Sequence, residues 1–298
     1  MLGVAGYLIN IGSVGPMIQA DEGSYLANAA AIAGYRNDMA SSYHGGYSLI
    51  IAPVFWLASS PLDIWAGIKL VNSMLYAVTV FILGLLVNAF FPAATARQRL
   101  VGVTLAAIYP MWVVLAGYSF PQIAFVPLYL LVVYLFYRSM RSDAAYWWPM
   151  LGVAAAYAYW IHPMGAPVIA AVVFAALYWA RVAKDYSAAG LCVLAIVASL
   201  ISYEALFVPW LHEHMTIGGL TPRFHYPGLS ESLVQLQSMD GWIKSCARLA
   251  GKSSIFRSAL WASSLLAFLV FCNGSRRRIQ MLNFLICIER VGCSFWAA

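Results

Sequence analysis

The sequence predicts an all-α fold, a polytopic transmembrane helical bundle of about eight spans. Hydrophobic residues make up 63% of the 298 positions and charged residues only 9%, whereas a soluble domain carries roughly 25% charge. Apolar runs of about 20 residues recur, which is the length that crosses a bilayer as a helix. A chain of this composition buries its apolar surface in lipid, so we expect a multi-pass membrane protein.

Short basic loops separate the apolar runs. We place the spans at about 1–20, 64–91, 100–117, 123–137, 147–161, 164–181, 188–210 and 257–273. Four of the loops between or after them hold nine of the 17 basic residues, namely Arg97, Arg99, Arg138, Arg141, Arg181, Lys184, Arg276, Arg277 and Arg278. Such loops face the cytoplasm under the positive-inside rule.

This topology places the amino terminus on the cytoplasmic side of the plasma (inner) membrane. The external side then holds two long loops, about 21–63 and 211–256, and short turns at 118–122 and 162–163. The net charge is +6. Because the basic residues lie mostly in short loops between spans, we interpret this charge as setting the membrane topology. We therefore expect the bilayer as a partner and no nucleic acid. Residues 274–298 form a basic cytoplasmic segment and an atypical tail, of which 279–298 would make a poor span.

The first external loop contains two apolar segments too short to cross the membrane. Residues 23–34 are rich in alanine, and residues 47–58 are apolar and aromatic with Pro53 inside. We expect both to form helices that lie in the interface plane.

The acidic pair Asp21-Glu22 opens this loop, directly after the first apolar run. Acidic side chains at a membrane edge are costly and usually functional. Asp21 is either the N-cap of a helix that begins near Gly23 or a general base that takes a proton from an acceptor hydroxyl. Glu22 points elsewhere on the helix; it is the second catalytic candidate, or else a solvated side chain.

The motif His44-Gly45-Gly46-Tyr47 follows in the same loop. Gly-Gly frees the backbone, so the motif is either a simple turn or a place where the backbone closely approaches a phosphate. In the second interpretation His44 donates a hydrogen bond, and we include Tyr47 among the candidate phosphate-binding residues.

Two further candidates lie at or near the external ends of spans. His162, before Pro163, is either a satisfied polar group or a phosphate contact. Glu204 lies roughly 9 Å inside the seventh span at 1.5 Å per residue. It either faces a cavity or pairs with a basic residue of the long external loop.

The long external loop supplies cationic candidates. Arg223 and His225 lie between prolines among aromatic residues, and arginine is suited to bidentate phosphate contact; a solvated loop is the alternative. His212 and His214 are too weak a pattern for a metal, and the five cysteines have no metal-ligand spacing. We therefore assign no metal ligands and no definite cofactor, and leave a divalent cation open.

Several of these stretches resemble GT-C glycosyltransferases, the superfamily that includes aminoarabinose, mannosyl and protein O-mannosyl transferases. Residues 21–29 and 44–53 resemble the first external loop of that family, 109–137 its third and fourth helices, and 152–167 a later basic-Pro motif in which His162 replaces the usual basic residue. The resemblance covers roughly residues 1–210, and it makes 1–273 a GT-C-like transmembrane domain.

The resemblance implies an inverting sugar transfer from a polyprenyl phosphate or pyrophosphate donor to a glycan, lipid or protein acceptor on the external side, in cell-envelope chemistry. Asp21 matches the family's catalytic base and Glu22 the second acid of its pair. The chain departs from the family at Pro121-Gln122, where many members have another acid, and it is shorter than most of them.

Two other function classes stay open at this point. A transporter or flippase of a lipid-linked molecule would place polar residues at mid-membrane on broken helices, and prolines such as Pro127 and Pro167 fit it. An inactive, truncated GT-C paralogue would fit the Pro121-Gln122 departure. Polar residues cluster on the external side, which favours the enzyme.

Overall fold

The computed structural model describes residues 2–10, 20–35, 43–142 and 144–215, and every regular element within them is a helix. Four of these helices are long and apolar enough to cross a membrane: Pro61–Phe90, Gln122–Arg141, Gly165–Ala183 and Tyr186–Glu213. The predicted all-helical class is therefore confirmed for the described residues. The predicted count of about eight spans is not, and the span expected at 257–273 lies outside those residues.

The amino-terminal part consists of α1 (Leu2–Asn10), α2 (Ala20–Ile32) and α3 (Gly46–Leu57). Helices α2 and α3 match the two short helices expected in the first loop, and they pack against each other. Pro53 lies inside α3 without ending it. Its ring is exposed, whereas Ile51, Ala52 and Phe55 are buried.

Helix α4 (Pro61–Phe90) is the longest element. It begins where Ser60 accepts the Asp63 N–H and Pro61 occupies the first turn, a position at which its missing N–H costs nothing. The predicted span 100–117 is divided into α5 (Ala96–Ala107) and α6 (Pro110–Ala116). Tyr109 is extended there (ψ 120°), because the residue before a proline avoids the helical region.

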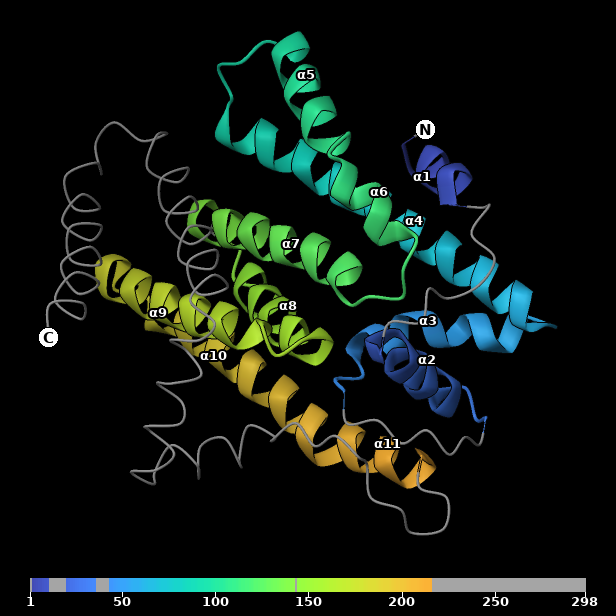
Figure 1. The fold of residues 1–298 in the computed structure, drawn as a ribbon. Coiled ribbons are helices and arrows are strands. Elements are labelled where there is room, and N and C mark those ends of the chain that lie inside the picture. The colour runs from blue at the N-terminus through green and yellow to red at the C-terminus, as the bar shows by residue number, and fades with distance from the viewer. Residues whose placement is uncertain (1, 11–19, 36–42, 143, 216–298) are drawn as a thin grey trace, which may run out of the picture.

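The second half of the described chain forms a bundle of α7 (Gln122–Arg141), α8 (Trp147–Ile161), α9 (Gly165–Ala183) and α10 (Tyr186–Ile201). Gly152 brings α8 close to α10, since a Cβ there would lie 2.4 Å from the Cys192 carbonyl oxygen. Helix α10 continues through a π-helical segment (Ser202–Phe207) into α11 (Val208–Met215), and the three form one long rod that reaches α2 (Figure 1).

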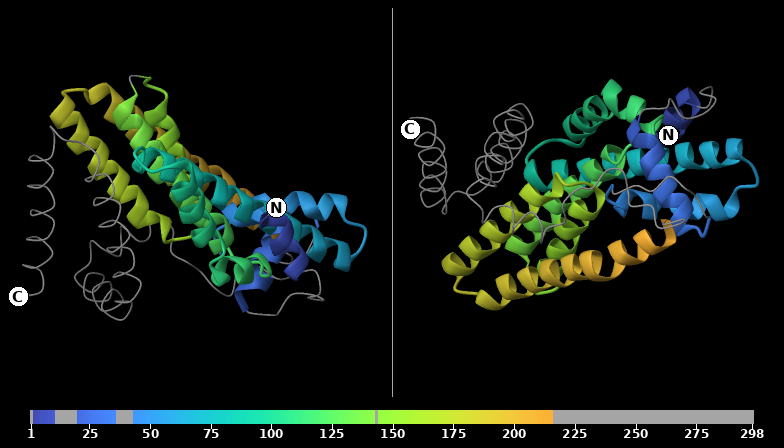
Figure 2. Two further views of the ribbon diagram at one scale, coloured as in Figure 1. Left: turned by 90° about the horizontal axis from the view of Figure 1, so that it is seen from above. Right: turned by 60° about the horizontal axis from the view of Figure 1, so that its bottom comes forward.

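The helices give the molecule two chemically different ends. The ends at which α4 meets α5, α7 meets α8 and α9 meets α10 lie together at one end (Figure 1). There the Tyr137 hydroxyl near the end of α7 donates to the Ala89 carbonyl near the end of α4. Helices α2 and α3 lie at the other end, beside α11 and the α8–α9 turn (Figures 1 and 2). The basic residues at helix ends gather at the first end and the acidic pair lies at the second.

Candidate functional site

The acidic pair divides into two environments at the start of α2. Asp21 is exposed and accepts a 2.7 Å hydrogen bond from the Tyr43 hydroxyl, whereas Glu22 is fully buried. Consecutive helical residues point about 100° apart, so one carboxylate faces outward while the next faces the bundle. Because α2 already begins at Ala20, Asp21 lies in the first turn and the N-cap interpretation is wrong. The solvated interpretation of Glu22 is also wrong.

Glu22 is part of a buried polar network that joins four parts of the chain. Its Oε1 accepts the Ser119 backbone N–H at 2.8 Å. Beside it, the Tyr47 hydroxyl donates to Asn72 Oδ1 at 2.9 Å, and Asn72 Nδ2 donates to the Tyr118 carbonyl at 2.8 Å. The network therefore fixes α2, α3, α4 and the α6–α7 loop relative to one another.

Tyr47 supports this network and is closed to a ligand in the described structure. Its side chain is completely buried and its hydroxyl is already given to Asn72. Burial, reinforced by the nearby negative charge of Glu22, raises the pKa of Tyr47. The phenol consequently stays neutral, and the predicted role of Tyr47 in direct phosphate binding is replaced by a supporting role.

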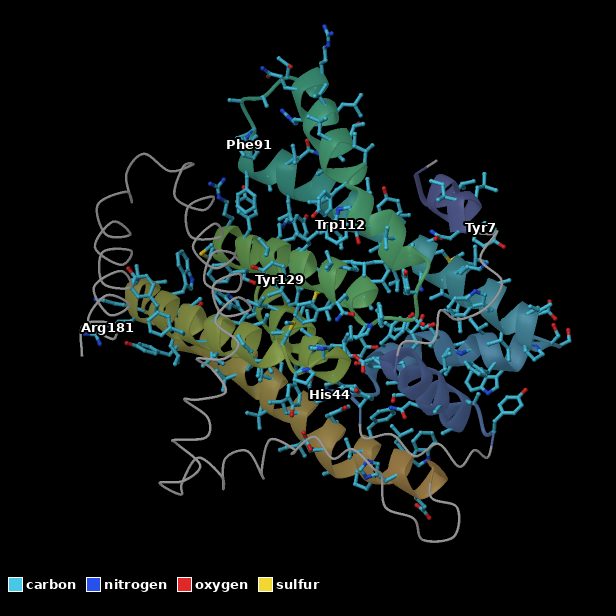
Figure 3. All side chains as sticks on the ribbon, viewed as in Figure 1. Tyr7, His44, Phe91, Trp112, Tyr129 and Arg181 are labelled. Atoms are coloured by element: carbon cyan, nitrogen blue, oxygen red, sulfur yellow. The ribbon has the colours of Figure 1, made fainter. Side chains whose placement is uncertain are left out.

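His44 lies just before α3, in a cage of aromatic side chains. Its ring stacks on Tyr203 (centroids 5.8 Å apart, planes at 20°) and meets Tyr159 edge-on at 4.8 Å. It is only 8% exposed, and its buried Nε2 has no hydrogen-bond partner among the described residues. Burial, and then the charge of nearby His162, lower the pKa of His44 to about 4. His44 is therefore uncharged at neutral pH and supplies no positive charge for a phosphate. Its hydrogen bond to a phosphate stays a prediction. Figure 3 shows His44 at the end of the molecule that holds α2 and α3.

The glycines after His44 are needed for helix packing. A Cβ on Gly46 would lie 2.5 Å from the Trp160 carbonyl group of α8, and one on Gly45 would lie 2.5 Å from the Phe207 ring. The Gly45 N–H donates to the Tyr203 hydroxyl, and the Gly46 carbonyl accepts from Tyr157. The backbone of this motif closely approaches the protein's own α8 and π-helical segment. The approach to a phosphate stays a prediction.

His162 follows α8 as its C-cap residue and is half-buried. Its Nδ1 accepts the Met164 N–H at 3.1 Å. In neutral His162 the proton consequently lies on Nε2, which is the nitrogen able to donate to a phosphate oxygen. The structure thus brings His162 near His44, at the same end of the bundle as the acidic pair.

Glu204 lies on the π-helical segment and is half-buried. Such segments are rare and occur often at functional sites. The Tyr159 hydroxyl donates to Glu204 Oε1 at 3.3 Å. This contact links Glu204 to the aromatic cage of His44; the basic partner expected from the long loop lies outside the described residues.

The remaining candidates are not placed. Arg223 and His225 lie outside the described residues, and the side chain of His214 is not described either. No group of three or more metal-ligand side chains occurs among the described residues, and Cys192 is a buried free thiol.

Several site residues escape prediction from the sequence. Tyr43, Ser119, Tyr159 and Tyr203 carry no local pattern that distinguishes them. Lys69 and Asn72 do carry a signal, because polar residues inside an apolar run are costly and usually functional. Lys69 is 3% exposed and donates to the Asn10 carbonyl at the end of α1, at 3.0 Å.

No protein family model, no curated protein and no solved structure matches this chain. The functional argument therefore rests on the residues and their geometry.

Proposed function

We propose that this protein is an integral-membrane glycosyltransferase of the GT-C type. It transfers a sugar with inversion from a polyprenyl-phosphate-linked donor to an acceptor hydroxyl on the external face. The observation that carries the proposal is the divided acidic pair: Asp21 is exposed and oriented by Tyr43, while Glu22 is buried and anchors the neighbouring loop through Ser119. A general base needs both access to the acceptor and a fixed direction.

The transfer requires one proton removal and one displacement. Asp21 takes the acceptor's hydroxyl proton as the acceptor oxygen forms a bond to the anomeric carbon. The bond from that carbon to the phosphate oxygen breaks, its electron pair stays on the oxygen, and the polyprenyl phosphate or pyrophosphate leaves. Attack opposite the leaving group inverts the anomeric centre.

Charge builds on the phosphate during this step and needs stabilisation. Among the described candidates, His162 fits this role through its Nε2, since His44 is uncharged and caged. Arg223 and His225 remain part of the proposal as cationic phosphate contacts from the long loop. Glu204 with Tyr159 then forms the polar wall beside the donor.

The first test is Asp21→Asn in purified protein reconstituted in lipid, with release of sugar from a panel of radiolabelled polyprenyl-phosphate sugars as the readout. Loss of the base should lower the rate roughly 10²–10⁴-fold. Asp63→Asn is the matched control, because Asp63 is another exposed acid in the first turn of a helix of the same predicted external region. Near wild-type turnover by Asp21→Asn would show that Asp21 is not the general base.

A transporter of a lipid-linked molecule is the second candidate, favoured by polar residues inside candidate spans. Lys69 and Asn72 are buried in α4, and Glu204 lies in the π-helical segment that interrupts the regular α-helix of the Tyr186–Glu213 span. Movement of a fluorescent polyprenyl-phosphate lipid across liposomes, unaffected by Asp21→Asn and without sugar release, would favour this function. If folded protein neither releases sugar nor moves the lipid, the inactive GT-C paralogue becomes the favoured interpretation.

A further inference from the structure

Arg181 is an exposed arginine at the end of the molecule opposite the labelled His44 (Figure 3). It lines a hollow in the apolar surface. The hollow has a volume of about 400 Å³ and is lined by Phe174, Leu177, Tyr178, Arg181 and Tyr186. Four of these residues belong to α9 and Tyr186 begins α10. The hollow therefore lies where two candidate membrane spans meet, at the end that the basic residues predict to be cytoplasmic.

Three other arginines at this end, Arg99, Arg138 and Arg141, are engaged by their own chain. Arg138 lies over the Trp147 ring at 4.8 Å and Arg141 over the Tyr137 ring at 4.9 Å. Arg99 donates to Asn88 and to two backbone carbonyls. Arg181, by contrast, makes no hydrogen bond, ion pair or ring contact with another described residue.

The acid nearest to Arg181 in the sequence is also engaged elsewhere. Asp185 caps α10, and its Oδ1 accepts from the Ser187 hydroxyl at 2.6 Å and from the Ala188 N–H at 3.2 Å. The helix dipole of α9 favours a cation in its last turn. The same effect acts on the arginines at the end of α7, and it does not account for the apolar hollow beside Arg181. Arg181 is thus held near an apolar hollow with its guanidinium available.

We propose that this hollow binds a bilayer phospholipid with an anionic headgroup. The Arg181 guanidinium would hold the phosphate, for which its planar array of donors is suited. The ring edges of Phe174 and Tyr186 and the Leu177 side chain, which are 53–67% exposed, would hold the first part of the acyl chains. Basic pockets between spans on the cytoplasmic side are suited to such headgroups. The proposal does not depend on the glycosyltransferase function.

Native mass spectrometry of the full chain in detergent, titrated with phosphatidylglycerol and separately with phosphatidylcholine, tests the proposal. We expect wild-type protein to bind phosphatidylglycerol more tightly, and Arg181→Gln to bind it about fivefold more weakly. Arg181→Lys should retain most of the binding. Arg97→Gln is the matched control, since Arg97 is exposed at the same end but does not line this hollow, and it should bind as the wild type does.

A second variant tests the hollow separately from the arginine. Leu177→Ala removes an apolar side chain from the lining at a half-exposed position and leaves Arg181 unchanged, so it should fold and yet bind the anionic lipid more weakly. Unchanged phosphatidylglycerol binding in Arg181→Gln, or an equal loss in Arg97→Gln, would overturn the proposal. Displacement of the lipid by millimolar inorganic phosphate alone would also overturn it, because the apolar contacts would then contribute nothing.

Discussion

Two neighbouring carboxylates in this protein lie in different environments because a helix turns between them. Asp21 is accessible and oriented by one hydroxyl, which suits proton transfer. Glu22 is buried and satisfies a backbone N–H that would otherwise be unpaired. A buried polar group without a partner costs far more than a hydrogen bond contributes, so we expect the two acids to affect different measurements.

Glu22→Ala should lower the free energy of unfolding by about 1–3 kcal/mol, because the Ser119 N–H loses its partner inside the bundle. Glu22→Gln keeps an acceptor oxygen and should lose less. Reversible unfolding by SDS in mixed micelles measures both. Asp21→Ala, at an exposed position, is the control and should unfold nearly as the wild type does; a similar loss in all three variants would contradict the division of tasks.

His44 should make the protein less stable in acid. Its pKa is lowered from 6.5 to about 4 in the folded state, so the unfolded chain binds a proton that the folded chain refuses between these values. Stability from this group is therefore complete above about pH 6.5 and is lost as the pH falls toward 4. The loss amounts to roughly 3 kcal/mol.

The matched variant for this measurement is His44→Phe, which keeps a ring in the aromatic cage and removes the titration. Unfolding is followed between pH 7 and pH 4 in both proteins, and the difference isolates His44 from its neighbours His162 and Glu204, which are present in both. Parallel pH profiles for the two proteins would show that His44 does not titrate as its burial requires.

At the scale of elements, close packing at a glycine holds the site together. Helix α3 begins against the last turn of α8, and only a residue without a side chain fits at Gly46. This crossing places His44 within its cage and Tyr47 within the Glu22 network, so both clusters depend on one backbone contact.

Gly46→Ala should destabilise the protein by about 1–3 kcal/mol, since the new Cβ meets the rigid backbone of Trp160 and α3 has to move. Gly84→Ala is the control: it lies within α4, and no atom lies within 4 Å of the place that its methyl group would take. Alanine there favours the helix by up to about 1 kcal/mol. SDS unfolding should therefore shift in opposite directions for the two variants. Equal shifts would mean that the crossing tolerates a side chain.

Some elements follow directly from the sequence and others do not. The bounds predicted for the segment 147–161 coincide with helix α8, although α8 is not among the four candidate spans. The span predicted at 164–181 lies within two residues of α9 at each end. Apolar runs bounded by His162-Pro163 and charged turns have clear limits. The predicted span 100–117 is broken at Tyr109-Pro110, whereas α3 continues through Pro53. The local sequence does not determine whether a proline ends a helix. The neighbouring helices determine it, because they provide the contacts of the backbone that the proline interrupts.

The site shows the same limit more strongly. The position of the acidic pair beside an apolar run is enough to predict a functional role for the pair. That prediction requires no information about contacts with distant parts of the chain. The roles of its members do need such information, because Glu22 finds its partner at Ser119, 97 positions away. His44 likewise is caged by Tyr159 and Tyr203 from other helices, which no spacing in the sequence indicates.

At the scale of the whole molecule, the separation of acidic and basic ends predicts the orientation in the membrane. Ser59 lies before α4 and Ala183 ends α9, and both are exposed. In a cysteine-free background, Ser59→Cys should react with a membrane-impermeant maleimide on intact cells. Ala183→Cys should react only after permeabilisation, as the positive-inside rule requires. The reverse pattern would invert the topology, and labelling of both sites on intact cells would contradict a bundle with two opposed ends.

The long separation between Glu22 and Ser119 has a consequence for biosynthesis. Ribosomes add roughly 5–20 residues per second, so about 5–20 s pass between synthesis of the carboxylate and of the N–H that it binds. During this interval four further helices, α3 to α6, leave the ribosome while the acid has no such partner. We expect α2 to remain at the aqueous boundary until the α6–α7 loop arrives, so that completion of the acidic site is a late event in membrane insertion.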